Sequence, residues 1–253
     1  KEALPAREVC EAIARGIRHV LPSARIELIP MADGGEGTVD ALIAATGGRI
    51  TETVVTGPLG DPVTARWGML GDGSQTAVLE MTAASGLALV PRERRSPMLT
   101  STYGTGELIR AALDGGAARI LLGIGGSATV DGGIGALQAL GAQFRLKGDD
   151  FHGEPLVGHH LAEIVSVRPP DQWKLPEILI ACDVENPLCG PDGAAEVFGP
   201  QKGATPDQVK QLDLWLANLA GAMDAQQRAS AKGSGAAGGL GFGLSAMIPG
   251  VRM

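Results

Sequence analysis

Aromatic side chains are scarce in this chain and make up only 3% of its 253 residues. Hydrophobic residues nevertheless account for 44% of the sequence, so the core has to be built from alanine, valine, isoleucine and leucine. The length suffices for one large domain or two modest ones. We therefore expect a globular chain with a well-filled aliphatic core.

Cysteine and histidine are also rare. The three cysteines are Cys10, Cys182 and Cys189, and an odd, sparse set without a secretory leader fits a reducing, cytoplasmic environment. Cys182 and Cys189 lack zinc-finger spacing, and the four histidines form no ligand set beside them, which argues against a structural metal.

The chain has no excess of basic charge. Its net charge is −7 and no basic stripe is visible, which argues against a nucleic-acid partner but leaves small anionic substrates open. Residues 233–250 lack charge but are rich in glycine, so we expect a backbone-lined loop that opens a buried helix, not a membrane span. A Walker A loop is absent from the sequence.

A strand, a glycine-rich loop and a helix follow one another between Arg119 and Gly141. Ile120–Leu122 has the pattern of a buried parallel strand, and a helix is expected from Ile134. Glycine exposes backbone N–H groups, and a helix N-terminus favours negative charge. We therefore predict a phosphate or carboxylate site formed by Gly125, Gly126, Ser127, Thr129, Asp131, Gly132 and Gly133.

This loop also contains a weak dinucleotide pattern. Gly123, Gly125 and Ala128 match G-x-G-x-x-[GA], but the acidic residue expected about 20 positions further on is missing. A nicotinamide-dependent oxidoreductase is therefore an alternative with limited support. Asp131 has a structural alternative of its own, which is to cap the helix that follows.

A second unit of the same kind begins near the start of the chain. Residues 25–30 resemble a short strand, and a helix is predicted from Val39 to Ala45. The loop between them contains Asp33 and Glu36, which we interpret as functional because α/β sheets place ligands beyond the carboxyl ends of their strands. The alternative is that Asp33 or Thr38 only caps the helix. The predicted ligand-binding set here is Asp33, Gly34, Gly35 and Glu36.

The pattern changes near Ile50, where we predict a domain boundary. Alternating, β-branched runs at residues 53–56, 63–70 and 76–81 are separated by turn signals and predict an antiparallel region. Glu80 interrupts the third run, so it either faces a site or has a buried partner. Helices are also predicted at residues 5–20 and 107–113, and after the capping box that begins at Thr205.

Residues Glu177–Cys182 predict another buried strand, which ends just before Asp183. A carboxylate at the end of a strand, with Asn186 three residues on, suits a general base or a Mg²⁺ ligand. The structural alternative is an Asx-turn.

Four segments, taken together, resemble bacterial glycerate kinases of the first class. They are MADGGEGT (31–38), GIGGSATVDGGIGALQALGA (123–142), CDVENPLCGPDGAAEVFGPQKGA (182–204) and GSGAAGGLGFG (233–243). The resemblance implies an α/β fold in which a Rossmann-like domain from both chain ends accompanies an inserted α/β domain with a mixed sheet. Residues 1–50 would belong to the first domain, completed by C-terminal material absent here, and residues 51–253 to the second.

The resemblance also implies a function. Such enzymes use ATP and Mg²⁺ to phosphorylate D-glycerate, most of them to 2-phosphoglycerate; the alternatives are a kinase for another small hydroxy acid or a non-catalytic sensor. Asp183 would be the base, Lys202 and Lys1 would neutralise charge, and Asp33, Glu36 and Asp183 would hold Mg²⁺. Asn186, Gln201 and Gly235 join the expected ligand-binding set. The expected partners are glycerate and a nucleotide, with neither nucleic acid nor membrane, and a homodimer is one assembly to test.

Overall fold

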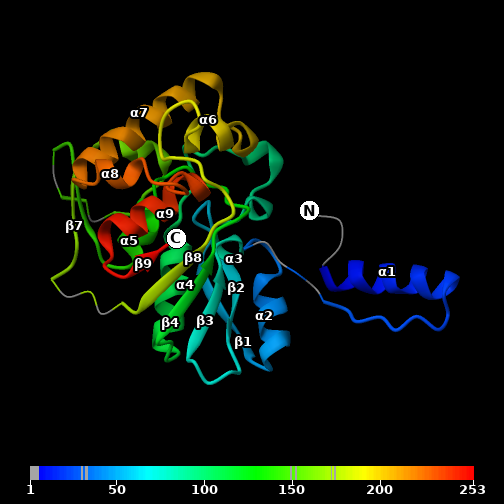
Figure 1. Ribbon diagram of the computed structural model, residues 1–253. Helices are drawn as coiled ribbons and strands as arrows, with labels where there is room; N and C mark the ends of the chain where they lie inside the picture. Colours follow the sequence, from blue (N-terminus) through cyan, green and yellow to red (C-terminus); the bar gives the residue numbers. More distant parts are fainter. Residues whose placement is uncertain are drawn as a thin grey trace.

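The computed structural model describes residues 6–29, 31, 34–148, 150–151, 153–171, 173 and 175–253 (Figure 1). A six-stranded sheet with the order β1-β2-β3-β4-β8-β9 forms its centre. The strands are β1 (Arg49–Thr56), β2 (Pro62–Met69), β3 (Thr76–Glu80), β4 (Arg119–Gly123), β8 (Glu177–Ala181) and β9 (Val251–Arg252). This mixed sheet confirms the α/β prediction.

The sheet changes direction at β3. The pairs β1–β2 and β2–β3 are antiparallel, as the turn signals predicted, whereas the pairs β3–β4, β4–β8 and β8–β9 are parallel. The predicted antiparallel region is therefore continuous with the parallel strands, because β3 pairs with both kinds of neighbour.

Alternate residues of the central strands face opposite helical layers. Val78 of β3 packs with Val39 and Ile43 of α2 (Thr38–Thr46) on one face. Leu79 and Leu122 face the main core on the other side, together with α4 (Tyr103–Asp114) and α5 (Ile134–Ala139). Helix α2 thus packs on the same sheet as the strands that follow it, and the domain boundary near Ile50 stays a prediction.

The remaining elements extend the main core beyond the sheet. A second, three-stranded sheet has the order β6-β5-β7. Its strands and the other helices are β5 (Gln143–Leu146), β6 (Asp150–Phe151), β7 (Ile164–Arg168), α3 (Thr82–Ser85), α6 (Ala194–Phe198), α7 (Pro206–Ala222), α8 (Gln226–Ala229) and α9 (Ala236–Met247), with 3₁₀ helices at Leu87–Leu89, Arg92–Arg94, Gly158–Ala162 and Pro200–Lys202. No helix in the described ranges is long and apolar enough to cross a membrane.

Two local predictions near the chain's C-terminal end are confirmed. Thr205 and Gln208 form the predicted capping box at the start of α7, each side chain bonding the other's backbone N–H. The uncharged stretch contains three left-handed residues at positions 237–239, with φ of 54°, 67° and 90°. A turn therefore precedes the buried part of α9, as expected from its glycines.

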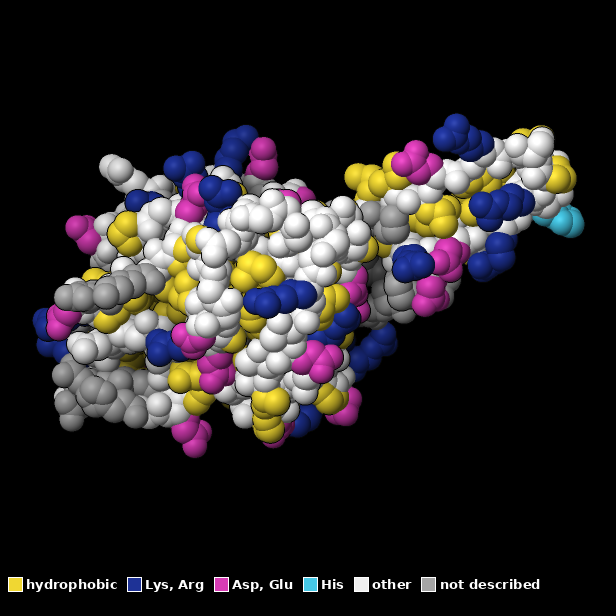
Figure 2. All heavy atoms as spheres, turned by 90° about the horizontal axis from the view of Figure 1, so that it is seen from below, with side chains coloured by type: hydrophobic (Ala, Val, Ile, Leu, Met, Phe, Trp, Pro, Cys, Tyr) yellow, Lys and Arg dark blue, Asp and Glu magenta, His cyan; other side chains and the backbone are white. Residues whose placement is uncertain are grey.

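The N-terminal helix projects from the rest of the molecule (Figure 1). Helix α1 (Ala6–Val20) confirms the predicted helix, but Ala14 is its one buried residue. Ile13 and Val20 are 58% and 76% exposed, and hydrophobic side chains line the arm seen at the right of Figure 2. The predicted strand that follows is wrong for residues 25–29, which have no regular structure, since no described strand pairs with them.

Candidate active site

The carboxyl ends of three parallel strands meet at one edge of the sheet. Glu80 of β3 pairs in register with Gly123 of β4, and Gly123 pairs with Ala181 of β8. A cleft of about 690 Å³ opens beside these strand ends. Its lining includes Glu36, Gly126 and Asp183, which come from three different loops. The structure thus brings together segments that are far apart in the sequence, at the place where α/β sheets bind ligands.

The two glycine-rich loops pack against each other at this edge. The Gly125 N–H donates to the Gly34 carbonyl at 3.2 Å, and a Cβ on Gly123 would overlap the same carbonyl oxygen. Gly123 and Gly125 are therefore explained by close backbone approach to the first loop. The match of these glycines to the dinucleotide-binding pattern is therefore explained by packing between the two loops.

Most of the amides predicted to hold an anion are already used within the protein. Besides Gly125, the Gly132 N–H donates to the Gly238 carbonyl at 2.9 Å, and the Gly133 N–H donates to Asp131 Oδ1 at 3.1 Å. Gly35, Gly126 and Ser127 line the cleft, whereas Gly132 and Gly133 lie against the leucines of α7 and α9. These three amides thus have partners within the protein, and a role for them in binding phosphate stays a prediction.

Asp131 lies in the core, away from the cleft wall. It is fully buried and accepts hydrogen bonds from the Thr102 N–H (2.9 Å) and the Thr102 hydroxyl (2.7 Å), as well as from Gly133. Burial raises the pKa of Asp131, against the opposing effect of these hydrogen bonds. The carboxylate links the start of α4 to the start of α5. The position of Asp131 therefore fits a structural role in capping a helix better than a role in contacting substrate.

Lys202 is buried at the back of the cleft. Only 2% of the residue is exposed, and its Nζ donates to Ser127 Oγ at 2.7 Å and to the Thr129 carbonyl at 2.6 Å. Burial lowers the pKa of Lys202 to about 7, although the charge of Asp131 partly opposes this shift. Thr129 is itself fully buried, and its Oγ1 has no partner among the described residues. The lysine therefore reaches the cleft from the core and can change charge near neutral pH.

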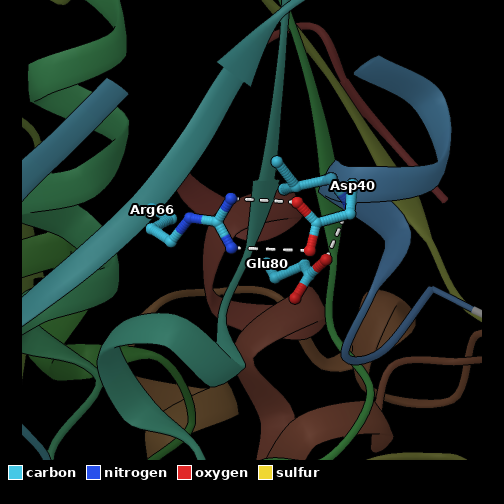
Figure 3. Close-up of polar contacts among 4 residues, drawn as sticks. Asp40, Arg66 and Glu80 are labelled. Atoms are coloured by element: carbon cyan, nitrogen blue, oxygen red, sulfur yellow. Dashed lines mark hydrogen bonds and ion pairs between the residues drawn. The ribbon is translucent and has the colours of Figure 1, made fainter. Parts of the chain in front are cut away.

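Glu80 both faces the cleft and caps a helix, so each of the two expectations for it holds. The residue is 8% exposed, and its Oε1 accepts the Val39 N–H of α2 at 2.6 Å (Figure 3). Burial raises the pKa of Glu80, and the negative charges of Asp40 and Glu36 add to this effect. The Thr38 hydroxyl instead donates to the Gly35 carbonyl at 2.8 Å, so it does not cap the helix as proposed.

An ion pair that the sequence analysis missed crosses the same cleft (Figure 3). Arg66 of β2 contacts Asp40 of α2 through both terminal nitrogens, at 3.0 and 3.4 Å. The two side chains are 49% and 59% exposed. In the sequence, Arg66 looks like the solvent-facing position of an alternating strand. Only the antiparallel pairing of β2 with β3 reveals that it lies near Glu80.

The remaining predicted residues divide into three groups. Glu36, Asp183 and Gln201 are exposed and line the cleft. Asn186 and Gly235 have structural contacts instead, since the Asn186 side chain donates to the Asp192 carbonyl at 2.8 Å and its backbone carbonyl accepts the Gly235 N–H at 2.9 Å. Lys1 and Asp33 lie outside the described residues.

Carboxylate oxygens in the cleft fit a hard divalent cation. Glu36 and Asp183 both line it, and Mg²⁺ characteristically uses one or two carboxylates together with substrate phosphates. No group of three or more His, Cys, Asp or Glu that could hold a metal occurs within the described part of the chain. The described residues therefore do not form a metal site from protein ligands alone. Glu36 and Asp183 are compatible with a Mg²⁺ site that is completed by a substrate phosphate.

Comparison with known proteins decides the family. The model of the glycerate kinase family matches residues 1–252. The chain belongs to the glycerate kinase family. It is 50% identical over 262 aligned residues to a glycerate kinase from Haemophilus influenzae, with 100% of this chain and 68% of that protein aligned. It is 48% identical to the glycerate 2-kinase of Escherichia coli K12, with 98% and 66% aligned.

The family's fold is also seen in a solved structure. A crystal structure described as glycerate kinase 2 from Salmonella typhimurium LT2 superposes with a TM-score of 0.84 at 46% identity. The match covers 100% of this chain and 69% of that one. The chain therefore spans about two thirds of the length of these glycerate kinases, over which sequence and fold agree.

Proposed function

We propose that this chain forms the active site of an ATP-dependent kinase that phosphorylates D-glycerate to 2-phosphoglycerate. The observation that carries the proposal is the cleft at the carboxyl edge of β3, β4 and β8, found in a member of the glycerate kinase family. Exposed Asp183 and buried Lys202 both line this cleft. The E. coli relative named glycerate 2-kinase supports the choice of product.

Asp183 is the proposed general base. Its carboxylate follows β8 directly, is exposed in the cleft and can approach a substrate hydroxyl without a change of fold. ATP and Mg²⁺, when bound, supply the transferable phosphoryl group and neutralise part of its charge. Asp183 then has to orient the hydroxyl and accept its proton, and Glu36 is available to share the cation.

Lys202 is the proposed electrostatic partner of the transferred group. With its pKa near 7, part of the population is uncharged before an anion arrives. An anion in the cleft favours the protonated form, because opposite charges raise a lysine's pKa. Ser127, held at 2.7 Å from Nζ, fixes the lysine and offers its hydroxyl to the same region. Binding of a negatively charged phosphoryl group would thus increase the protonated fraction of Lys202, whose charge then stabilises that group.

Replacing Asp183 with asparagine tests the role of the base. We expect Asp183→Asn to lower kcat for ADP release with D-glycerate by about 10²- to 10⁴-fold, because the amide cannot accept the proton. The thermal melt should be nearly unchanged, since the side chain is exposed. The matched control is Glu185→Gln, two residues further on, whose carboxylate pairs with Lys232 on the exposed surface at 2.8 Å.

Several results would contradict the proposal. Wild-type turnover retained by Asp183→Asn would remove Asp183 from the role of base. Absence of ADP release from the wild-type chain with D-glycerate, but turnover of lactate, tartronate or glucarate, would move the activity to another hydroxy acid. Phosphorus NMR of the product shows which hydroxyl has been phosphorylated.

A further inference from the structure

The cleft offers a ligand two basic side chains among the described residues, and they differ in access. Lys202 is 2% exposed, and its ammonium is engaged with Ser127 and Thr129. The side chain of Arg66 is 49% exposed. A negatively charged group that enters from solvent therefore meets Arg66 as the accessible cation of the described wall.

Two nearby backbone amides that could bind an anion are already in use. The first amide of α2 that points toward this region, that of Val39, donates to Glu80 at 2.6 Å. The Gly125 amide donates to Gly34. The carboxylates of Glu36, Glu80 and Asp183 also line the cleft and repel a second anion. A substrate carboxylate therefore needs a compensating cation on this side.

Asp40 holds the guanidinium in a fixed orientation. The two contacts at 3.0 and 3.4 Å involve both terminal nitrogens, yet a guanidinium has more N–H groups than these contacts use. An ion pair exposed to this degree adds little to stability, commonly less than about 1 kcal/mol. Its geometry is better explained by orientation of Arg66, because a planar guanidinium with free donors matches the two oxygens of a carboxylate.

The position of β2 distinguishes this point from the glycine-loop side of the cleft. In the sheet order, β2 is separated from β4 by β3, so Arg66 and the loop after β4 are about two strand spacings, or roughly 10 Å, apart. Small-acid and phosphate groups can occupy the two sides together. Building on the proposed function, we propose that Arg66 binds the carboxylate of the hydroxy-acid substrate and that Asp40 positions its guanidinium.

Steady-state kinetics of the full chain test this assignment. We expect Arg66→Gln to raise the KM for D-glycerate by about 10- to 100-fold, with less than about a 3-fold change in the KM for ATP and in kcat, because a charge-assisted pair is lost from binding. Arg66→Lys should recover part of the affinity, and Asp40→Asn should give a smaller rise. The wild-type preference for glycerate over uncharged glyceramide should collapse in Arg66→Gln.

A second arginine provides the matched control. Arg119 forms a comparable ion pair with Glu177 at 3.1 Å, and its side chain is 48% exposed. It begins β4, at the strand end opposite Gly123, so Arg119→Gln should leave both KM values unchanged. A structural effect of losing a surface arginine would affect both variants alike, whereas loss of a carboxylate contact affects only Arg66→Gln.

The outcomes separate this inference from the proposed function. Unchanged KM values in Arg66→Gln would overturn the inference while wild-type turnover upholds the function. A rise in the KM for ATP alone would assign Arg66 to phosphate and overturn the carboxylate assignment. If the wild type shows no turnover, the proposed function is wrong. Calorimetric titration of both proteins with D-glycerate then tests the carboxylate contact by itself. Binding that Arg66→Gln loses supports the carboxylate contact, whereas equal binding or none overturns it.

Discussion

The ammonium of Lys202 illustrates how a single side chain combines a cost to folding with a proposed use in the cleft. Its side chain is buried, and its Nζ donates hydrogen bonds to two residues of the loop after β4. Desolvation disfavours the charged form and lowers the pKa to about 7. The folded chain thus releases a proton that the unfolded chain retains up to the ordinary lysine pKa of 10.5.

This difference predicts a pH dependence of stability. Between about pH 7 and pH 10.5 the unfolded state binds more protons, so the free energy of unfolding of the wild type should rise with pH. The rise should approach about 1.4 kcal/mol per pH unit within that window, relative to Lys202→Met. Urea unfolding of both proteins from pH 6.5 upward measures the difference. Parallel profiles for wild type and Lys202→Met would contradict the lowered pKa.

At the level of elements, helix α4 depends on a close approach that its sequence conceals. Gly104 lies in its first turn, where a Cβ would overlap the carbonyl oxygen of Thr56 at the end of β1. The same two elements are joined by the Thr56 N–H, which donates to Glu107 at 2.6 Å. The helix can therefore contact β1 only because residue 104 has no side chain.

Alanine at position 104 should consequently destabilise the protein, although alanine favours helices. We expect Gly104→Ala to lower the free energy of unfolding by about 1–3 kcal/mol through overpacking, as measured by chemical denaturation. Gly16→Ala in α1 is the control, because a Cβ there has nothing within 4 Å. That change should leave the unfolding midpoint unaltered or slightly raised. Equal effects in the two variants would argue against the steric explanation.

Elements with a strong local signal were predictable from the sequence, and those that depend on distant contacts were not. The apolar runs of β4 and β8 and the capping box at Thr205 are local patterns, and the structure confirms them. Residues 25–29 have a strand-like pattern but no described partner strand. A strand requires a neighbour, which a local pattern cannot supply.

In the candidate site, too, residues with a local sequence signal were predictable, and those placed by tertiary packing were not. The position of Asp183 at a strand end could be read from the sequence, as could the chemistry of Lys202 once the resemblance was recognised. The Arg66–Asp40 pair could not, because it joins β2 to α2 through tertiary packing. The loop glycines indicated an anion site, but the structure shows that several of their amides bond within the protein.

For the whole molecule, the main contrast is between the packed body and the projecting α1. Ala14 is the one buried residue of α1, whereas α4 buries six, among them Leu108 and Ile109. Isolated helices of about this length are marginal in water, so α1 receives little support from packing.

Hydrogen exchange should reveal this contrast in the 253-residue chain. We expect the backbone amides of α1 to exchange close to the rate of local helix fraying, and those of α4 at rates that approach global unfolding. Mass spectrometry of peptides from residues 6–20 and 103–114 makes the comparison. Similar protection in the two helices would show that α1 is held by contacts beyond those described.

The cleft walls are drawn from residues as far apart as Gly35 and Ala237. A nascent chain that ends before residue 202 therefore contains five of the six strands of the central sheet, yet neither Lys202 nor the turn before α9. The lining of the cleft is therefore completed only after these later residues have been synthesised, although the strands beside it are already present. Products terminated before that point would keep much of the scaffold and lack part of the cleft lining, including Lys202.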